Sequence, residues 1–247
     1  MTASHFRHLL FDLGGTLMRA RGDWEAVHAR ADQALAGVLH QHNIHIEARQ
    51  FRERLHEYYE QRDKDLQETT YHFVLRETLK ALGQAECAES VLRSALDALY
   101  SVTQSNWEIE NDAVETLREL KFNQYKLGIF SNAGDDKDVQ ELIEGFGIRP
   151  HFDFVLTSAA CFYRKPHPRA FEMALAQWNI EPNEAVMIGD SLEADIQGAK
   201  QLGMRTIWIT RRARFTDEEM RRIKPDFSIR KLTELPPTLE RIALRRI

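Results

Sequence analysis

The sequence predicts an α/β fold, a Rossmann-like parallel sheet with helices on both faces, plus an inserted all-helical cap domain. Apolar runs in the second half of the chain carry this prediction: residues 127–130, 185–188 and 206–209. Each run ends in small or polar residues and precedes a helical pattern, as in repeated strand–helix units around a buried parallel sheet. A further strand is expected near the start and two weaker ones later, at residues 9–13, 154–157 and 227–229. The sheet should therefore have five or six strands.

The stretch after the first strand has a different pattern. Its apolar residues recur at helical spacing, for example at Leu92, Leu96, Leu99 and Tyr100, and no convincing strand interrupts it. We therefore expect a core domain formed by residues 1–18 and 108–247 and a helical cap domain formed by residues 19–107. Hinges are expected around residues 19–23 and 107–112, because the chain crosses between the two domains there.

Composition excludes several classes of protein. The 247 residues are 43% hydrophobic and 29% charged, with a net charge of −5, so there is no general bias toward nucleic acid or anionic membranes. The arginines of the second half are interspersed with acids, and no apolar run approaches the roughly 18 residues of a membrane span. Cys87 and Cys161 are expected to be packing residues in a reducing compartment. We expect a cytoplasmic protein with no nucleic-acid or membrane partner; nothing in the sequence indicates its oligomeric state.

Polar residues that could carry chemistry follow four of the expected strands. They are Asp12, Ser131 with Asn132, Lys165, and Asp190 with Asp195. Taken singly, each could be an ordinary turn or helix-capping residue. The carboxyl ends of parallel strands meet at one edge of a sheet, so these residues are expected to converge. A carboxylate nucleophile, a hydroxyl, a cation and further carboxylates for Mg²⁺ are the parts of a phosphoryl-transfer site.

Four segments resemble the motifs of the haloacid dehalogenase (HAD) superfamily, in the subgroup with a helical cap inserted after the first strand. The segments are FDLGGTL, GIFSNAG, RKPHPRAF and MIGDSLEADIQGAKQLGM. The resemblance implies that Asp12 attacks phosphorus to form an aspartyl-phosphate. It also implies that Ser131, the Asn132 backbone and Lys165 bind the transferring group. By the same resemblance, Mg²⁺ would be held by Asp12, the Gly14 carbonyl, Asp190 and Asp195.

Two positions depart from the superfamily pattern. Gly14 stands where phosphatases of the superfamily usually have the aspartate that protonates the leaving oxygen and then activates water. General acid–base help contributes about 10²- to 10⁴-fold in rate, so its loss would be serious without abolishing catalysis. We expect the acid to be absent or supplied from the cap. Phe162 stands where glycine is common, and a narrower approach to the substrate is expected there.

The expected function is that of a Mg²⁺-dependent phosphatase acting on a small phosphorylated metabolite. The main alternative is a catalytically weakened binding or regulatory protein. Lesser alternatives are a dehalogenase, in which Asp190 and Asp195 would lack a purpose, and a phosphonate-cleaving enzyme, for which Lys64 or Lys80 of the cap would form a Schiff base. One of the ten histidines could replace the missing acid, although nothing in their spacing selects one.

Overall fold

The computed structural model describes residues 6–212 and 215–244. Its main sheet has six parallel strands in the order β5-β4-β1-β6-β7-β8. The strands are β1 (His8–Phe11), β4 (Lys126–Ser131), β5 (Phe154–Thr157), β6 (Ala185–Gly189), β7 (Arg205–Ile209) and β8 (Phe227–Ile229). The expected α/β class and the six-strand sheet are confirmed.

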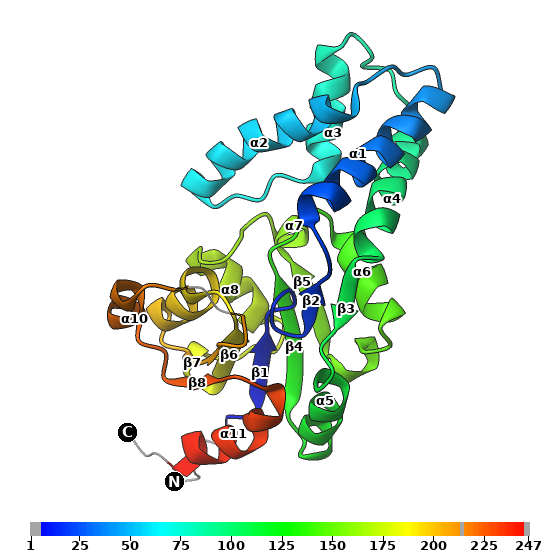
Figure 1. Ribbon diagram of the computed structural model, residues 1–247. Helices are drawn as coiled ribbons and strands as arrows, with labels where there is room; N and C mark the ends of the chain where they lie inside the picture. Colours follow the sequence, from blue (N-terminus) through cyan, green and yellow to red (C-terminus); the bar gives the residue numbers. More distant parts are fainter. Residues whose placement is uncertain (1–5, 213–214, 245–247) are drawn as a thin grey trace.

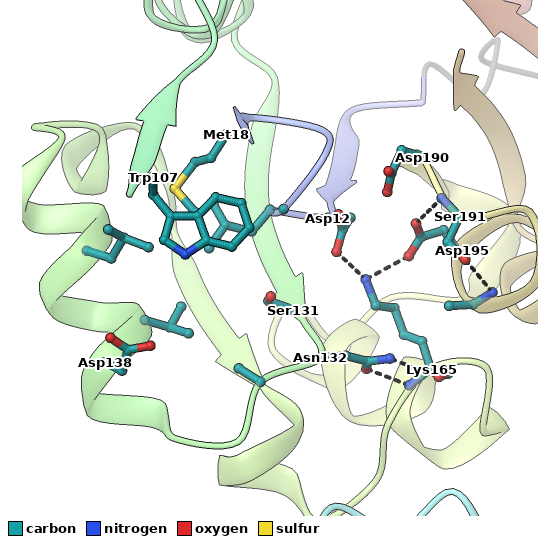
Figure 2. Close-up of a pocket in the computed structure, with 16 residues that line it drawn as sticks. Asp12, Met18, Trp107, Ser131, Asn132, Asp138, Lys165, Asp190, Ser191 and Asp195 are labelled. Atoms are coloured by element: carbon teal, nitrogen blue, oxygen red, sulfur yellow. Dashed lines mark hydrogen bonds and ion pairs between the residues drawn. The ribbon is translucent and has the colours of Figure 1, made fainter. Parts of the chain in front are cut away.

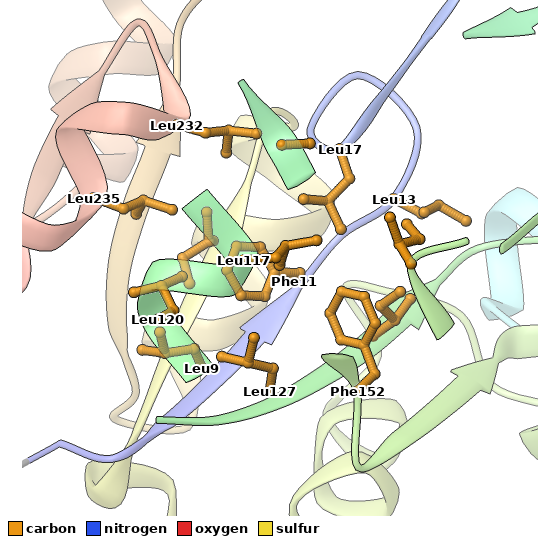
Figure 3. Packing of buried hydrophobic residues seen from close by; sticks show 14 of the residues in the cluster. Leu9, Phe11, Leu13, Leu17, Leu117, Leu120, Leu127, Phe152, Leu232 and Leu235 are labelled. Atoms are coloured by element: carbon orange, nitrogen blue, oxygen red, sulfur yellow. The ribbon is translucent and has the colours of Figure 1, made fainter. Parts of the chain in front are cut away.

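Helices cover both faces of the sheet (Figure 1). The core helices are α5 (Ala113–Phe122), α6 (Asp136–Gly145), α7 (Ser158–Cys161), α8 (Pro168–Ala176), α9 (Gly198–Gln201), α10 (Asp217–Ile223) and α11 (Leu235–Leu244). Successive strand residues point to opposite faces, so Leu9 and Phe11 pack with α5 in one cluster (Figure 3) while Leu10 packs with α8 in another. Burial on both faces explains why the strands read as continuous apolar runs.

Four long helices precede this core and pack mainly on one another. They are α1 (Trp24–Gln41), α2 (Ala48–Asp65), α3 (Tyr71–Ala81) and α4 (Glu89–Gln104). Their buried side chains form a hydrophobic cluster of their own, which includes Leu35, Phe51, Leu75 and Leu96. Figure 1 shows this helical layer, α1–α4, beyond one end of the sheet. The residue boundaries expected for the two domains stay a prediction.

A two-stranded antiparallel ribbon joins the helical layer to the core. It consists of β2 (Met18–Ala20) and β3 (Trp107–Ile109), and the Glu110 amide extends the pairing by donating to the Leu17 carbonyl at 2.9 Å. The expectation that residues 19–107 contain no strand is therefore wrong at both ends. Strands of three residues are too short to show an alternating pattern, and their partners are 89 residues apart in the chain, as for Arg19 and Glu108.

Polar contacts also tie the helical layer to loops at the carboxyl ends of β4 and β5. The buried Glu68 carboxylate accepts a hydrogen bond from Ser158 Oγ at 2.5 Å and pairs with Arg164 at 2.9 Å. Arg93 of α4 pairs with Asp135, the N-cap residue of α6, at 2.7 Å. These contacts bring the helical layer close to the sheet edge where the sequence places its candidate residues.

Among the described residues, none of the helices combines the length and the apolar composition that a membrane-spanning helix needs.

Candidate active site

Lys165 lies at the centre of the residues that the sequence singles out. Its Nζ atom is 2.7 Å from Asp12 Oδ1 and 2.7 Å from Asp195 Oδ1, and it donates to the Phe130 carbonyl at 2.8 Å. The lysine is only 2% exposed. Burial lowers the pKa of the Lys165 amine, but the carboxylates of Asp12 and Asp195 outweigh burial, and the pKa is raised. The ammonium ion is therefore charged at neutral pH.

Asn132 fixes the backbone of Lys165. The Asn132 side-chain oxygen accepts from the Lys165 amide at 2.8 Å, and its Nδ2 donates to the Lys165 carbonyl at 2.9 Å (Figure 2). This two-point contact joins the end of β4 to the segment that carries the lysine, across 33 residues of chain. The sequence-based assignment involved only the Asn132 backbone, so the positioning role of the side chain is an addition from the structure.

Three carboxylates converge beside the lysine. Oxygen atoms of Asp12, Asp190 and Asp195 all lie within 4.8 Å of one another. Asp12 follows β1, and its amide donates to the Ile188 carbonyl of β6 at 2.9 Å. Asp195 is 1% exposed and accepts from the Ser191 amide at 3.0 Å. The adjacent strands β1 and β6 thus bring together residues that are 178 positions apart in the sequence, as Asp12 and Asp190 are.

Glycines make room for two of these carboxylates. A Cβ atom added to Gly15 would lie 2.1 Å from Asp190 Oδ2, and Gly15 also has a positive φ of +81°. A Cβ atom added to Gly189 would lie 2.3 Å from Asp195 Oδ2. Both distances are far below van der Waals contact, so any side chain at either position would displace a carboxylate.

The carboxylate cluster carries more negative charge than Lys165 offsets. Burial raises the pKa of Asp190 to about 7, and the charges of Asp12 and Asp195 add to this effect. Burial also raises the pKa of Asp195 to about 6, although Lys165 opposes the shift. Crowded carboxylates are stabilised in their ionised form by a nearby cation. Oxygen ligands of this kind are those that Mg²⁺ prefers, so the residues present fit the metal that the sequence predicts.

Trp107 occupies the space beside Gly14. A Cβ atom added to Gly14 would lie 3.3 Å from Trp107 Cη2. The indole belongs to β3, and Figure 2 shows it beside Met18 at the edge of the pocket. A side chain at position 14 would therefore press against the ring of Trp107, which must shift by a few tenths of an ångström to admit it.

These residues line one pocket with a volume of about 270 Å³. Its polar wall contains Asp12, Ser131, Asn132, Lys165, Asp190, Ser191, Asp195 and Asp138, and its apolar wall contains Leu13, Met18, Trp107, Ala133, Val139, Leu142 and Ala194, with Gly14 between them. The predicted convergence of strand-end residues in space is thus observed, while their chemical roles stay predictions.

Several residues considered from the sequence lie outside this pocket. Phe162 does not line it and is 67% exposed, so the expected narrowing by this side chain is wrong. Lys64 and Lys80 are exposed and do not line it either, and no histidine among the described residues does so. Among the residues the structure describes, therefore, none of these offers a Schiff-base amine or an imidazole to the pocket.

Comparison with known proteins identifies the family. The family model described as "Haloacid dehalogenase-like hydrolase" matches residues 39–209, more than half of the chain. The chain belongs to the haloacid dehalogenase-like hydrolase family. The superfamily resemblance seen in the sequence is thereby confirmed.

Curated relatives of this HAD family member match part of their length. Over 105 residues it is 40% identical to haloacid dehalogenase-like hydrolase domain-containing protein 3 of Bos taurus, covering 42% of this chain and 41% of that protein. Over 167 residues it is 31% identical to phosphoserine phosphatase of Thermus thermophilus, covering 66% of this chain and 62% of that enzyme. The chain thus spans about two fifths and three fifths of the length of these relatives.

Solved structures share the fold of this HAD protein. The 2-haloacid dehalogenase of Pseudomonas syringae aligns with a TM-score of 0.70 and 24% identity, covering 96% of this chain and 99% of that one. At this identity the likeness concerns the fold alone.

One carboxylate that lines the pocket of the HAD protein, that of Asp138, is missing from the sequence-based set. Asp138 lies in the first turn of α6, seven residues after Ser131, and a carboxylate there normally suits the positive end of the helix dipole. The helix dipole is a sufficient reason for an acidic residue at this position, so the sequence does not indicate that Asp138 also lines the same pocket as Asp12. Its half-buried carboxylate accepts a hydrogen bond from Gln104 of α4, and this contact between α6 and α4 is visible only in the structure.

Proposed function

We propose that this protein is a Mg²⁺-dependent phosphatase that acts on a small phosphorylated metabolite through an aspartyl-phosphate on Asp12. The single observation that carries the proposal is the convergence of three carboxylates, two of which pair with one buried lysine. The phosphatase named among the relatives supports the reaction class.

Asp12 is the proposed nucleophile because it directly follows β1 and lines the pocket, where its carboxylate accepts a hydrogen bond from Lys165. A carboxylate can approach an anionic phosphoryl group only where cations offset the repulsion, and Lys165 is one such cation. Ser131 would donate its hydroxyl to a phosphoryl oxygen, because it ends β4 and lines the same pocket. The backbone amide of Asn132 would also bind the phosphoryl group.

Asp12, Asp190 and Asp195, with the Gly14 carbonyl, would hold the Mg²⁺ ion. When bound, the ion supplies positive charge next to the nucleophile and the phosphoryl oxygens. The same cluster disfavours the dehalogenase alternative, because a metal-independent reaction gives Asp190 no role, whereas Asp195 would still pair with Lys165. The small pocket and the apolar surface of Trp107 and Met18 favour a compact leaving group.

Phosphate release tests the proposal. We expect turnover of small phosphate monoesters or acyl phosphates with Mg²⁺, loss of that turnover with a chelator, and at least about a 10³-fold lower rate for Asp12→Asn. Intact mass measured after rapid mixing should show a phosphoryl group on wild-type Asp12. Turnover that is equal in Asp12→Asn would contradict the proposed nucleophile. Phosphometabolite binding without any turnover would support the binding-protein alternative instead.

Trp107 determines what an aspartate at position 14 can do. The variant Gly14→Asp places its Cβ at 3.3 Å from Trp107 Cη2, so we expect the single variant to gain little activity. In the double variant with Trp107→Phe, the distal ring atoms that crowd the new side chain are gone. We expect the double variant to exceed Gly14→Asp by about tenfold or more in kcat for alkyl phosphates. Trp107→Phe alone is the control, and a gain in it equal to that of the double variant would show that the aspartate contributes nothing.

A further inference from the structure

Asp138 is a carboxyl group in the pocket to which the proposed function gives no task. It belongs to the first turn of α6, and its amide donates to the N-cap Asp135 side chain at 3.0 Å. Its own carboxylate accepts from Gln104 Nε2 of α4 at 2.8 Å. Figure 2 shows Asp138 below Trp107, on the side of the pocket away from Lys165 and Asp195. It therefore lies apart from the carboxylates that would bind the metal.

The surroundings of Asp138 favour its protonated form. Burial raises the pKa of Asp138 to about 7, against the opposing effect of the Gln104 hydrogen bond. Charged or titratable groups that face it are Arg93 and Tyr100 on α4 and Asp135 and Glu141 at the start and middle of α6. The two acids raise the pKa further, and Arg93 lowers it. A carboxyl group poised near neutral pH is matched to proton transfer.

The position of Asp138 fits the leaving-group side of the pocket. Phosphoryl transfer proceeds with the attacking and leaving oxygens roughly in line, so the leaving oxygen points away from Asp12. Gln104 is the last residue of α4, so the contact with Asp138 places this carboxyl where the helical layer meets the core. Trp107, which lies beside Gly14, lines the same pocket.

We propose that Asp138 is the general acid of the reaction and takes over the task of the aspartate that Gly14 replaces. This role rests on the proposed phosphatase function. As Asp12 Oδ bonds to phosphorus, the bond from phosphorus to the leaving oxygen breaks, and its electron pair stays on that oxygen. The leaving oxygen takes the proton of the Asp138 carboxyl group and departs as an alcohol.

The second half of the reaction restores the enzyme. The Asp138 carboxylate accepts a proton from a water molecule as the water oxygen bonds to phosphorus. The bond between phosphorus and Asp12 then breaks, and its electrons return to the Asp12 carboxylate. Phosphate leaves, and Asp138 is again protonated. Each proton that Asp138 gives is thus regained from the water that is consumed.

A series of leaving groups tests this role with Asp138→Asn, in which the amide oxygen can still accept from Gln104. We expect kcat/KM for an alkyl phosphate such as glycerol phosphate to fall about 10²- to 10³-fold, because its alkoxide must be protonated. For p-nitrophenyl phosphate we expect a loss below about fivefold, since nitrophenolate leaves without a proton. Glu144→Gln removes an exposed carboxylate from the same helix and should change neither rate. A merely structural role would lower kcat/KM equally for both substrates.

The variant Gln104→Leu gives a second test through the pH profile. Its lost hydrogen bond favoured the charged form of Asp138, so the pKa should rise and the basic limb of kcat/KM should move to higher pH. Activity falls above this pKa because the acid must be protonated. An unmoved basic limb, or equal losses for both substrates in Asp138→Asn, would overturn the role of Asp138 while wild-type turnover leaves the phosphatase proposal standing. A silent wild type would overturn both.

Discussion

Lys165→Met should abolish most of the activity and destabilise the fold. The lysine is the only cation within 2.7 Å of both Asp12 and Asp195 among the described residues, and it is buried with them. Removing one partner of a buried charge cluster costs about 3–5 kcal/mol of unfolding free energy, because the remaining charges are left uncompensated. Loss of a charge that stabilises a transition state costs about 10²- to 10³-fold in kcat.

Urea unfolding, measured with and without Mg²⁺, tests whether uncompensated carboxylate charge causes the loss of stability. The ion should stabilise Lys165→Met more than it stabilises wild type, because the variant lacks the one cation that pairs with these carboxylates among the residues the structure describes. Lys121→Met provides the control, since Lys121 pairs with Asp153 at 3.3 Å on the surface and its loss should cost no more than about 1 kcal/mol. A Lys165→Met protein with wild-type kcat would exclude Lys165 from phosphoryl binding.

Asp138→Asn should stabilise the protein at high pH and leave it unchanged at low pH. The pKa of Asp138 is raised from 3.8 to about 7 in the folded protein, so the folded state binds more protons than the unfolded chain between these values. Wild-type stability therefore falls as the pH rises through this window. Asparagine does not titrate, and the variant avoids that loss. A shift of about three units corresponds to roughly 4 kcal/mol, so we expect a gain of about 2–4 kcal/mol after allowance for partial exposure.

Urea unfolding at pH 4 and pH 8 with a chelator present measures this difference. The titration of Asp190 and Asp195 is common to both proteins and cancels in the comparison. Glu144→Gln should show no pH-dependent gain. A gain for Asp138→Asn that is the same at both pH values would mean that Asp138 ionises like an exposed carboxylate. The expected result would show a stability cost retained at a functional site.

Residues at the ends of strands could be predicted from the sequence because one local pattern fixes both the strand and its end. Asp12 and Asp190 each follow an apolar run, and parallel pairing of those runs places them together. No local sequence pattern indicates the order of the strands in the sheet. The carboxyl ends of parallel strands lie at the same edge whatever that order is. This is why the candidate site could be assembled from the sequence without knowing which strands are neighbours.

Contacts between the helical layer and the core could not be predicted in this way. Trp107 fills the space beside Gly14 only because β3 pairs with β2, and neither three-residue strand has a sequence pattern. Asp138 is half-buried where Gln104 of α4 contacts α6. Both features depend on contacts between the helical layer and the core, and hydrophobic periodicity carries no information about such contacts.

Two ion pairs and a hydrogen bond join α4 to α6 in a polar seam. Arg93 pairs with Asp135, Lys137 of α6 pairs with Asp97 at 2.8 Å, and Gln104 binds Asp138. Ion pairs near the surface are screened by salt, so added salt should loosen this seam. Parting would hydrate Asp138 and make it an ordinary, ionised carboxylate. Asp138 would then be a proton donor only while α4 and α6 are in contact. A molecule in which the two helices have separated would admit or release its ligands without a protonated carboxyl group in the pocket.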